Sequence, residues 1–259
     1  MTATMYLENI LNKYAARSLD SYLLNINSLK TDLKNWASTC YIATINSGSR
    51  AKGTAISLAS DVDYLISLTS NCNANNGGLK SIYDSLYTFL KTNYSPVRKQ
   101  NVSFRIKIGI LEVDITPARK HSGNTNDHWI YVSKLDTWRQ TNIQKHITDI
   151  SNSGRQNEIK LLKIWRELNG LDFPSIYLEY LTINTLSGKS KDATKLADNF
   201  LFVLQELSKD TGNPLNSRIV DTANSTNILS DLLNVTEKNV IITKAKTAAG
   251  QKNWSGIVW

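Results

Sequence analysis

The spacing of apolar residues divides the chain into a front half that mixes strands with helices and a back half that is helical. Apolar residues recur every three or four positions in some segments and alternate with polar residues in others, which are the patterns of helices and of half-buried strands. The predicted front elements are one long helix over residues 5–35, strands over 41–45, 61–68, 102–108 and 111–115, and a helix over 79–91. Gly109 predicts a hairpin turn or bulge between the last two strands, and Pro117 is expected to close the second.

From residue 142 onward the apolar positions keep helical spacing. The predicted helices cover residues 161–168, 176–186, 192–207, 228–233 and 236–249. Trp165 and Tyr180 are expected in the core of this half. Since no stretch resembles a flexible linker, we expect a front domain over 1–140 and a helical lobe over 141–259 that share an interface.

Composition places the chain among soluble globular proteins. It has 259 residues, of which 41% are hydrophobic and 20% are charged, which are ordinary values for a folded domain. No apolar stretch is long enough to span a bilayer, and residues 1–6 lack the features of a secretion signal. We therefore expect a cytoplasmic protein that does not enter a membrane.

The cysteines, the histidines and the net charge do not point to a particular function. Cys40 and Cys72 have no zinc-type spacing and are interpreted as two unpaired thiols. His121 and His128 are expected in loops and His146 in structural hydrogen bonds, because none belongs to a metal motif. The net charge of +8 suits nucleotides, RNA or DNA, but ordinary solubility explains it equally well.

Three aspartates carry the strongest chemical signal. Asp61 and Asp63 are two residues apart in a predicted strand, so their side chains point the same way, and Asp114 follows in a later strand. Carboxylates are natural ligands of Mg²⁺ and Mn²⁺. Two such ions, about 3.5–4 Å apart, can activate a hydroxyl and neutralise a pyrophosphate leaving group. We expect Asp61 and Asp63 to bind both ions and Asp114 to complete the ion nearer the attacking hydroxyl.

Gly48 and Ser49 are the candidate phosphate site. They follow a short β-rich run and are expected to open a helix, where backbone N–H groups favour anions. Glycine lets the backbone come close to a ligand, and the Ser49 hydroxyl adds a donor. The leaving pyrophosphate is the expected ligand.

The order of these features resembles the polymerase-β-type nucleotidyltransferase superfamily, in which a Gly-Ser loop precedes two acidic residues and a third lies on a later strand. The segment from Gly48 to Asp63 is also similar to CCA-adding enzymes and poly(A) polymerases. Segments 161–166, 174–181 and 221–227 resemble the oligoadenylate synthases and the cGAS/DncV-like nucleotidyltransferases, or CD-NTases. The resemblance implies an α+β fold: a nucleotidyltransferase core of mixed sheet and helices, with a long N-terminal spine helix, packed on a C-terminal helical lobe.

The resemblance also implies roles for residues of the back half. Lys163 would contact the triphosphate of the donor nucleotide, and Ser175 would meet a phosphate. Composition and spacing alone favour a solvated lysine and leave Ser175 equally well explained as a helix cap. Where related enzymes often carry an aromatic residue that stacks on a base, this chain has Ile176, which leaves base preference open.

The predicted function is that of a CD-NTase that uses Mg²⁺ or Mn²⁺ to join nucleoside triphosphates into a cyclic or short linear oligonucleotide second messenger. By resemblance, the setting is bacterial anti-phage defence (CBASS), with a separate effector that reads the product. An activating protein or nucleic acid is left open. The alternatives are nucleotidyl transfer to an RNA 3′ end or to a protein, and a binding module that lacks catalysis.

Overall fold

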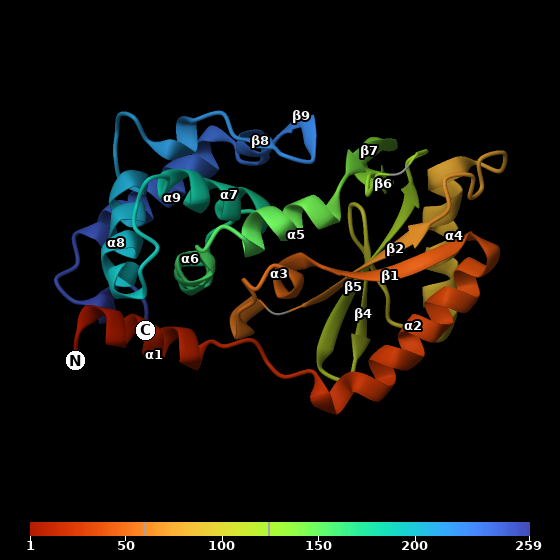
Figure 1. Cartoon of the computed structure of the whole chain (residues 1–259), viewed down its shortest axis with the longest axis horizontal. Helices are drawn as coiled ribbons and strands as arrows, with labels where there is room; N and C mark the ends of the chain where they lie inside the picture. Colours follow the sequence, from red (N-terminus) through yellow and green to blue (C-terminus); the bar gives the residue numbers. More distant parts are fainter. Residues whose placement is uncertain (60, 124) are drawn as a thin grey trace. The chain divides into compact units, whose positions relative to one another are not determined.

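A computed structural model describes residues 1–59, 61–123 and 125–259 (Figure 1). The chain divides into two compact units. One unit contains residues 17–52 and 60–147 and will be called the sheet unit. The other contains residues 1–16, 53–59 and 148–259 and will be called the helical unit. Within the described residues, no helix is both long and apolar enough to cross a bilayer.

The sheet unit is built on one mixed sheet. Its main order is β1-β2-β5-β4-β3, and β6 and β7 extend it from β5. β2 and β5 are parallel, and the other neighbouring pairs are antiparallel. Its elements are α2 (Leu23–Ala37), β1 (Tyr41–Ser47), α3 (Gly48–Ala51), β2 (Val62–Leu68), α4 (Gly78–Asn93), β3 (Arg98–Lys99), β4 (Phe104–Ile108), β5 (Leu111–Lys120), β6 (His128–Val132) and β7 (Thr137–Thr141).

Alternation along the strands separates an apolar face from a polar one. The buried members of β4 and β5, such as Phe104, Ile106 and Val113, form one core with apolar residues of α2 and α4, the two helices beside these strands in Figure 1. Intervening positions, such as Arg105 and Asp114, point to the opposite face because side chains alternate along a strand. The predicted strands over 61–68, 102–108 and 111–115 are thus confirmed as β2, β4 and β5.

The predicted single helix over residues 5–35 is wrong, because the structure has two helices there. α1 (Ala3–Lys13) ends where the backbone of Tyr14 accepts a hydrogen bond from Ser57 and Ala15 forms a β-bridge with Ile56. α2 then begins at Leu23. Leu7 and Ile10 pack in the core of the helical unit, whereas Ile26 and Leu29 of α2 pack in the core of the sheet unit. The apolar spacing is helical on both sides of the break, which is why the sequence pattern did not reveal it.

Two further expectations about the front half are corrected. Pro117 lies inside β5, at a point where pairing with β4 has ended at Ile115 and pairing with β6 begins only at Ala118. Proline, which has no N–H to donate, is tolerated there because residue 117 has no register partner on the side of β4 and β6. His128 is buried in β6 and not in a loop, and its Nε2 shares a 2.8 Å hydrogen bond with Ser67 Oγ.

The interpretation of Cys40 and Cys72 as unpaired thiols is also wrong, because a disulfide joins them. Cys40 directly precedes β1 and Cys72 follows β2. The antiparallel pairing of these strands, with Tyr41 opposite Leu68, brings the two Cα atoms to 5.5 Å. That separation lies within the usual range for a disulfide.

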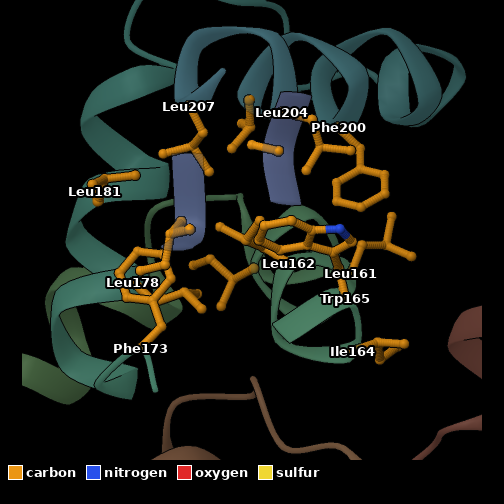
Figure 2. Packing of buried hydrophobic residues seen from close by; sticks show 14 of the residues in the cluster. Leu161, Leu162, Ile164, Trp165, Phe173, Leu178, Leu181, Phe200, Leu204 and Leu207 are labelled. Atoms are coloured by element: carbon orange, nitrogen blue, oxygen red, sulfur yellow. The ribbon is translucent and has the colours of Figure 1, made fainter. Parts of the chain in front are cut away.

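The helices of the helical unit pack around a second hydrophobic core. Figure 2 shows Trp165, Leu178 and Phe200, from three different helices, pointing into it. Trp165 and Tyr180 are buried, as predicted. The main elements are α1, α6 (Gln156–Leu168), α7 (Ser175–Thr185), α8 (Leu196–Leu207), α9 (Val235–Ala249) and the hairpin of β8 (Val220–Asp221) and β9 (Asn224–Ile228). α5 (Ile143–Ser151) carries the chain into this unit.

Candidate functional site

One row of register partners runs across the sheet and contains two of the three predicted aspartates. Asp63 of β2 pairs with Asp114 of the parallel strand β5, and on its other side with Ser47 of β1. Asp114 pairs in turn with Arg105 of β4, which pairs with Arg98 of β3. The prediction that Asp114 lies on a strand next to that of Asp63 is therefore confirmed. Asp61 lies just before β2.

The environment of Asp63 disfavours its charged form. Burial raises the pKa of Asp63 to about 6, and the negative charges of Asp114 and Asp61 act in the same direction. Burial also raises the pKa of Asp61, while the guanidinium of Arg105 opposes that shift. Carboxylates crowded in this way are stabilised when a cation binds among them.

In this structure the Arg105 guanidinium is a cation that contacts both Asp61 and Asp114. Its Nε donates to Asp114 Oδ1 and its Nη2 to Asp114 Oδ2, each at 2.7 Å. Nη2 also pairs with Asp61, and Nη1 lies 2.5 Å from Glu112 Oε2. The hydrogen bonds to Asp114 raise the pKa of Arg105, so the group stays charged. Arg105 lies in the strand predicted over residues 102–108, but the sequence indicates no role for it, since only register decides that it faces Asp114.

The carboxylates fit the divalent ions predicted from the sequence by their chemistry. Asp61, Asp63 and Asp114 supply only oxygen donors, the kind that Mg²⁺ and Mn²⁺ prefer. However, among residues 1–59, 61–123 and 125–259 no three His, Cys, Asp or Glu side chains form a ready-made metal cluster. Both oxygens of Asp114 already accept hydrogen bonds from Arg105, so the site has to rearrange to bind a metal.

Gly48 brings the backbone of the Gly-Ser segment against Asp63. The residue has a φ of +65°, and a Cβ atom there would lie only 1.8 Å from Asp63 Oδ2. Gly48 and Ser49 begin α3, a helix of one turn, directly after β1. The structure therefore places the predicted phosphate residues next to the predicted metal ligands. The roles of Gly48, Ser49 and the three aspartates in binding remain predictions.

A substitution at Gly48 tests this close approach. We expect Gly48→Ala to reduce nucleotide transfer at least about 100-fold and to destabilise the fold by about 1–3 kcal/mol, because a Cβ cannot fit without displacing Asp63. The measurements are initial rates and urea denaturation.

Gly212→Ala is the matched control for that substitution. Gly212 has a φ of +67°, but a Cβ atom there would meet nothing within 4 Å among the described residues. Gly212→Ala therefore has the same kind of backbone strain as Gly48→Ala but not the steric clash. Equal losses for the two variants would contradict a specific role of the contact between Gly48 and Asp63.

Arg50, in the same segment, lines a cavity of about 270 Å³ together with Asn27 and Lys30 of α2 and Tyr64 of β2. Its Nε and Nη2 atoms are buried and have no hydrogen-bond partner among the described residues. Burial lowers the pKa of Arg50, while Asp63 opposes that shift. The sequence indicates no role for Arg50, because nothing in the local pattern signals that part of its guanidinium is buried.

Lys163 and Ser175 belong to the helical unit. Lys163 is 2% exposed, and its Nζ donates to Glu179 Oε1 at 2.6 Å and to Thr54 Oγ1 at 3.0 Å. Ser175 is the first residue of α7, and its hydroxyl accepts a 2.9 Å hydrogen bond from Arg166. The expected contacts of Lys163 and Ser175 with phosphate remain predictions.

Comparison with solved structures supports the fold. The chain is similar to Escherichia coli MS115-1 CdnC in a complex with HORMA-deltaN, with 20% identity, a TM-score of 0.72, and coverage of 94% of this chain and 88% of that one. It is also similar to the Bradyrhizobium diazoefficiens CD-NTase CdnG in complex with GTP, with 10% identity, a TM-score of 0.73, and coverage of 99% and 95%. A third similar structure is the Elizabethkingia meningoseptica cyclic dinucleotide synthase CdnE with GTP and Apcpp, with 11% identity, a TM-score of 0.68, and coverage of 97% and 100%. These likenesses confirm the predicted α+β nucleotidyltransferase fold.

Sequence comparison supplies the family. A search of curated proteins finds no significant match. The model of the Second Messenger Oligonucleotide or Dinucleotide Synthetase domain matches residues 1–153, which is more than half of the chain and includes the Gly-Ser segment and all three aspartates. The chain therefore belongs to this family, the CD-NTase nucleotidyltransferases.

Proposed function

We propose that this nucleotidyltransferase uses Mg²⁺ or Mn²⁺ to join nucleoside triphosphates into a cyclic or short linear oligonucleotide second messenger. The observation that supports this most directly is the pairing of Asp63 with Asp114 on parallel neighbouring strands, with the backbone of Gly48 against Asp63. This arrangement gathers oxygen ligands and backbone donors at one place, as transfer of a nucleotide requires.

The reaction forms one bond and breaks another at the α-phosphorus of a nucleoside triphosphate. A ribose hydroxyl of the acceptor attacks this phosphorus, and pyrophosphate leaves with the electron pair of the broken bond. Asp114 accepts the hydroxyl proton, and the N–H groups of Gly48 and Ser49 bind the leaving pyrophosphate. Divalent ions held by Asp61, Asp63 and Asp114 would supply positive charge to the triphosphate and to the attacking oxygen.

Lys163 and Ser175 are proposed as further phosphate contacts of the donor nucleotide. For Lys163 the test must separate binding from folding, because its ammonium also pairs with the buried Glu179. A phosphate role predicts that Lys163→Met raises KM for the triphosphate at a temperature where the variant is fully folded.

The proposed setting is bacterial anti-phage defence, where a separate effector reads the product. An activating protein is also proposed, on the ground that the similar CdnC was solved in a complex with HORMA-deltaN. Both are tested by asking whether the purified chain is active alone or only when proteins of its genomic neighbourhood are added.

Product formation is the central experiment. The purified protein is incubated with all four labelled triphosphates and Mg²⁺ or Mn²⁺, and products that resist phosphatase are identified by mass spectrometry. We expect a cyclic or 2′–5′ or 3′–5′ linked oligonucleotide of low mass. A folded protein that forms no such product with either metal, even at alkaline pH, would overturn the synthase proposal.

A parallel reaction with tRNA addresses the alternative acceptor, with which the net charge of +8 is compatible. Label that appears in RNA and not in a small product would identify an RNA-modifying enzyme instead.

A further inference from the structure

Arg105 engages the same carboxylate oxygens that a metal would need. Asp114 Oδ1 accepts from Arg105 Nε and also from Gln100 Nε2, at 2.7 and 3.1 Å, while Oδ2 accepts from Arg105 Nη2. The same Nη2 group pairs with Asp61. A bidentate guanidinium and a divalent ion cannot use the same oxygen lone pairs at once.

Glu112 gives this guanidinium a further carboxylate partner besides the aspartates. It lies two residues before Asp114 on the same face of β5, and its Oε2 is 2.5 Å from Arg105 Nη1. The Glu112 side chain is 35% exposed and that of Asp114 only 13%. Arg105 can therefore release the more buried aspartate and still keep a carboxylate partner on the more exposed side.

We propose that Arg105 is a resident counter-cation of the Asp61–Asp114 pair, which divalent metal displaces toward Glu112. Without metal, Arg105 holds the two aspartates together against their mutual repulsion. When metal is bound, the Arg105 guanidinium stays beside the site because it remains paired with Glu112. Arg105 is thus a positioning residue that sets the metal concentration at which the site forms. This inference rests on the proposed function of the aspartates as metal ligands.

The test measures Mn²⁺ binding to the protein without nucleotide, by electron paramagnetic resonance of free Mn²⁺ and by calorimetry. We expect Arg105→Gln to lower the Kd for Mn²⁺ about tenfold or more, since the competing cation is gone. Lys107→Gln is the matched control: Lys107 is the next residue on the same face of β4, opposite Glu112, and it has no hydrogen bond to the aspartates in the described part of the chain. This control should change the Kd by less than about threefold.

Glu112→Gln distinguishes competition between Arg105 and the metal ion from a general effect of removing a charge near the site. In the natural chain it should weaken Mn²⁺ binding, because Arg105 loses its alternative partner and stays on the aspartates. In the Arg105→Gln background the same change should have a clearly smaller effect, since only the electrostatic contribution of the Glu112 charge is lost. Arginine-selective NMR of the natural chain provides a second readout: Mg²⁺ should shift the Nε–Hε signal that Arg105→Lys or Arg105→Gln removes.

The results distinguish this inference from the proposed function. If Arg105→Gln binds Mn²⁺ no more tightly than Lys107→Gln, or if Glu112→Gln has the same effect in both backgrounds, Arg105 is not a competing cation and the inference fails. If Mg²⁺ binds to the natural chain and the Arg105 Nε–Hε signal does not shift, the inference also fails. If neither the natural chain nor any variant binds metal, while all unfold cooperatively in urea, the metal-ligand role of the aspartates fails first.

Discussion

Replacing Asp63 with asparagine is expected to stop nucleotide transfer and, at the same time, to make the metal-free protein more stable above pH 6. Transfer should fall at least about 1,000-fold, because the site loses a carboxylate oxygen and its charge. The stabilisation follows from the raised pKa of Asp63, which burial and the nearby Asp114 and Asp61 hold at about 6.

The direction of the stability effect with pH follows from proton linkage. The carboxyl of Asp63 has a pKa of about 6 when folded and of about 3.9 when unfolded. Below about pH 3 both states are protonated, so the residue has no net effect on the free energy of unfolding. As the pH rises toward 6 the unfolded state ionises first, and stability falls by up to about 3 kcal/mol. Asparagine does not titrate, so the advantage of the variant should grow over this interval and stay constant above it.

Urea denaturation in EDTA at pH 4.5, 6 and 8 measures this effect. Asp198→Asn serves as the control, because Asp198 is an exposed carboxyl of the helical unit. A variant that is less stable than the natural chain at pH 8, or one that retains transfer activity, would contradict the assigned environment or the assigned role of Asp63.

Removing the charge of Glu179 is expected to destabilise the helical unit by about 3–5 kcal/mol. Glu179 is fully buried, and its Oε1 accepts hydrogen bonds from Lys163 at 2.6 Å and from Thr54 at 2.7 Å. Breaking a buried ion pair from one side costs much more than an exposed pair contributes, because the remaining charge loses a partner in a poorly solvated place. The change is Glu179→Gln, which keeps the size of the side chain, and the measurement is the free energy of unfolding in urea.

A double-mutant cycle with Lys163→Met completes this experiment. If the pair is the cause, the double variant should be more stable than the sum of the two single losses predicts, by about 2 kcal/mol or more. Asp198→Asn breaks the exposed pair of Lys195 and Asp198, and should change stability by no more than about 0.5 kcal/mol. Additive losses at positions 163 and 179 would mean that the two charges do not stabilise each other.

Local pattern was enough to predict much of the fold. Alternation revealed β2, β4 and β5, because one face of the sheet is covered by apolar side chains and the other is not. Helical spacing revealed α4, α6 and α7 in the same way. The spacing failed at residues 14–22, where α1 and α2 bury their apolar sides in different cores while the spacing remains helical. β3, β6, β7 and the β8–β9 hairpin were not predicted, and the helix predicted over residues 228–233 is wrong: Ile228 ends β9 and Leu229–Leu232 form one short 3-10 turn.

The sequence by itself determined which residues can do chemistry. The order of Gly48, Ser49, Asp61, Asp63 and Asp114 along the chain predicted nucleotidyl transfer, since each residue type supplies a group that this reaction needs. It also predicted that Asp61 and Asp63 share a face, because side chains in a strand alternate with a period of two.

Only the tertiary structure decided which of these groups meet. Strand register put Asp63 opposite Asp114 and Asp114 opposite Arg105, and the pairing of β1 with β2 joined Cys40 to Cys72. The tertiary structure also revealed that Lys163 pairs with Glu179 inside the helical unit. Register is set by the packing of a whole sheet face, and burial by residues far away in the chain. A local sequence pattern therefore identifies the charges at the site, whereas the partners of those charges are fixed only when distant segments pack together.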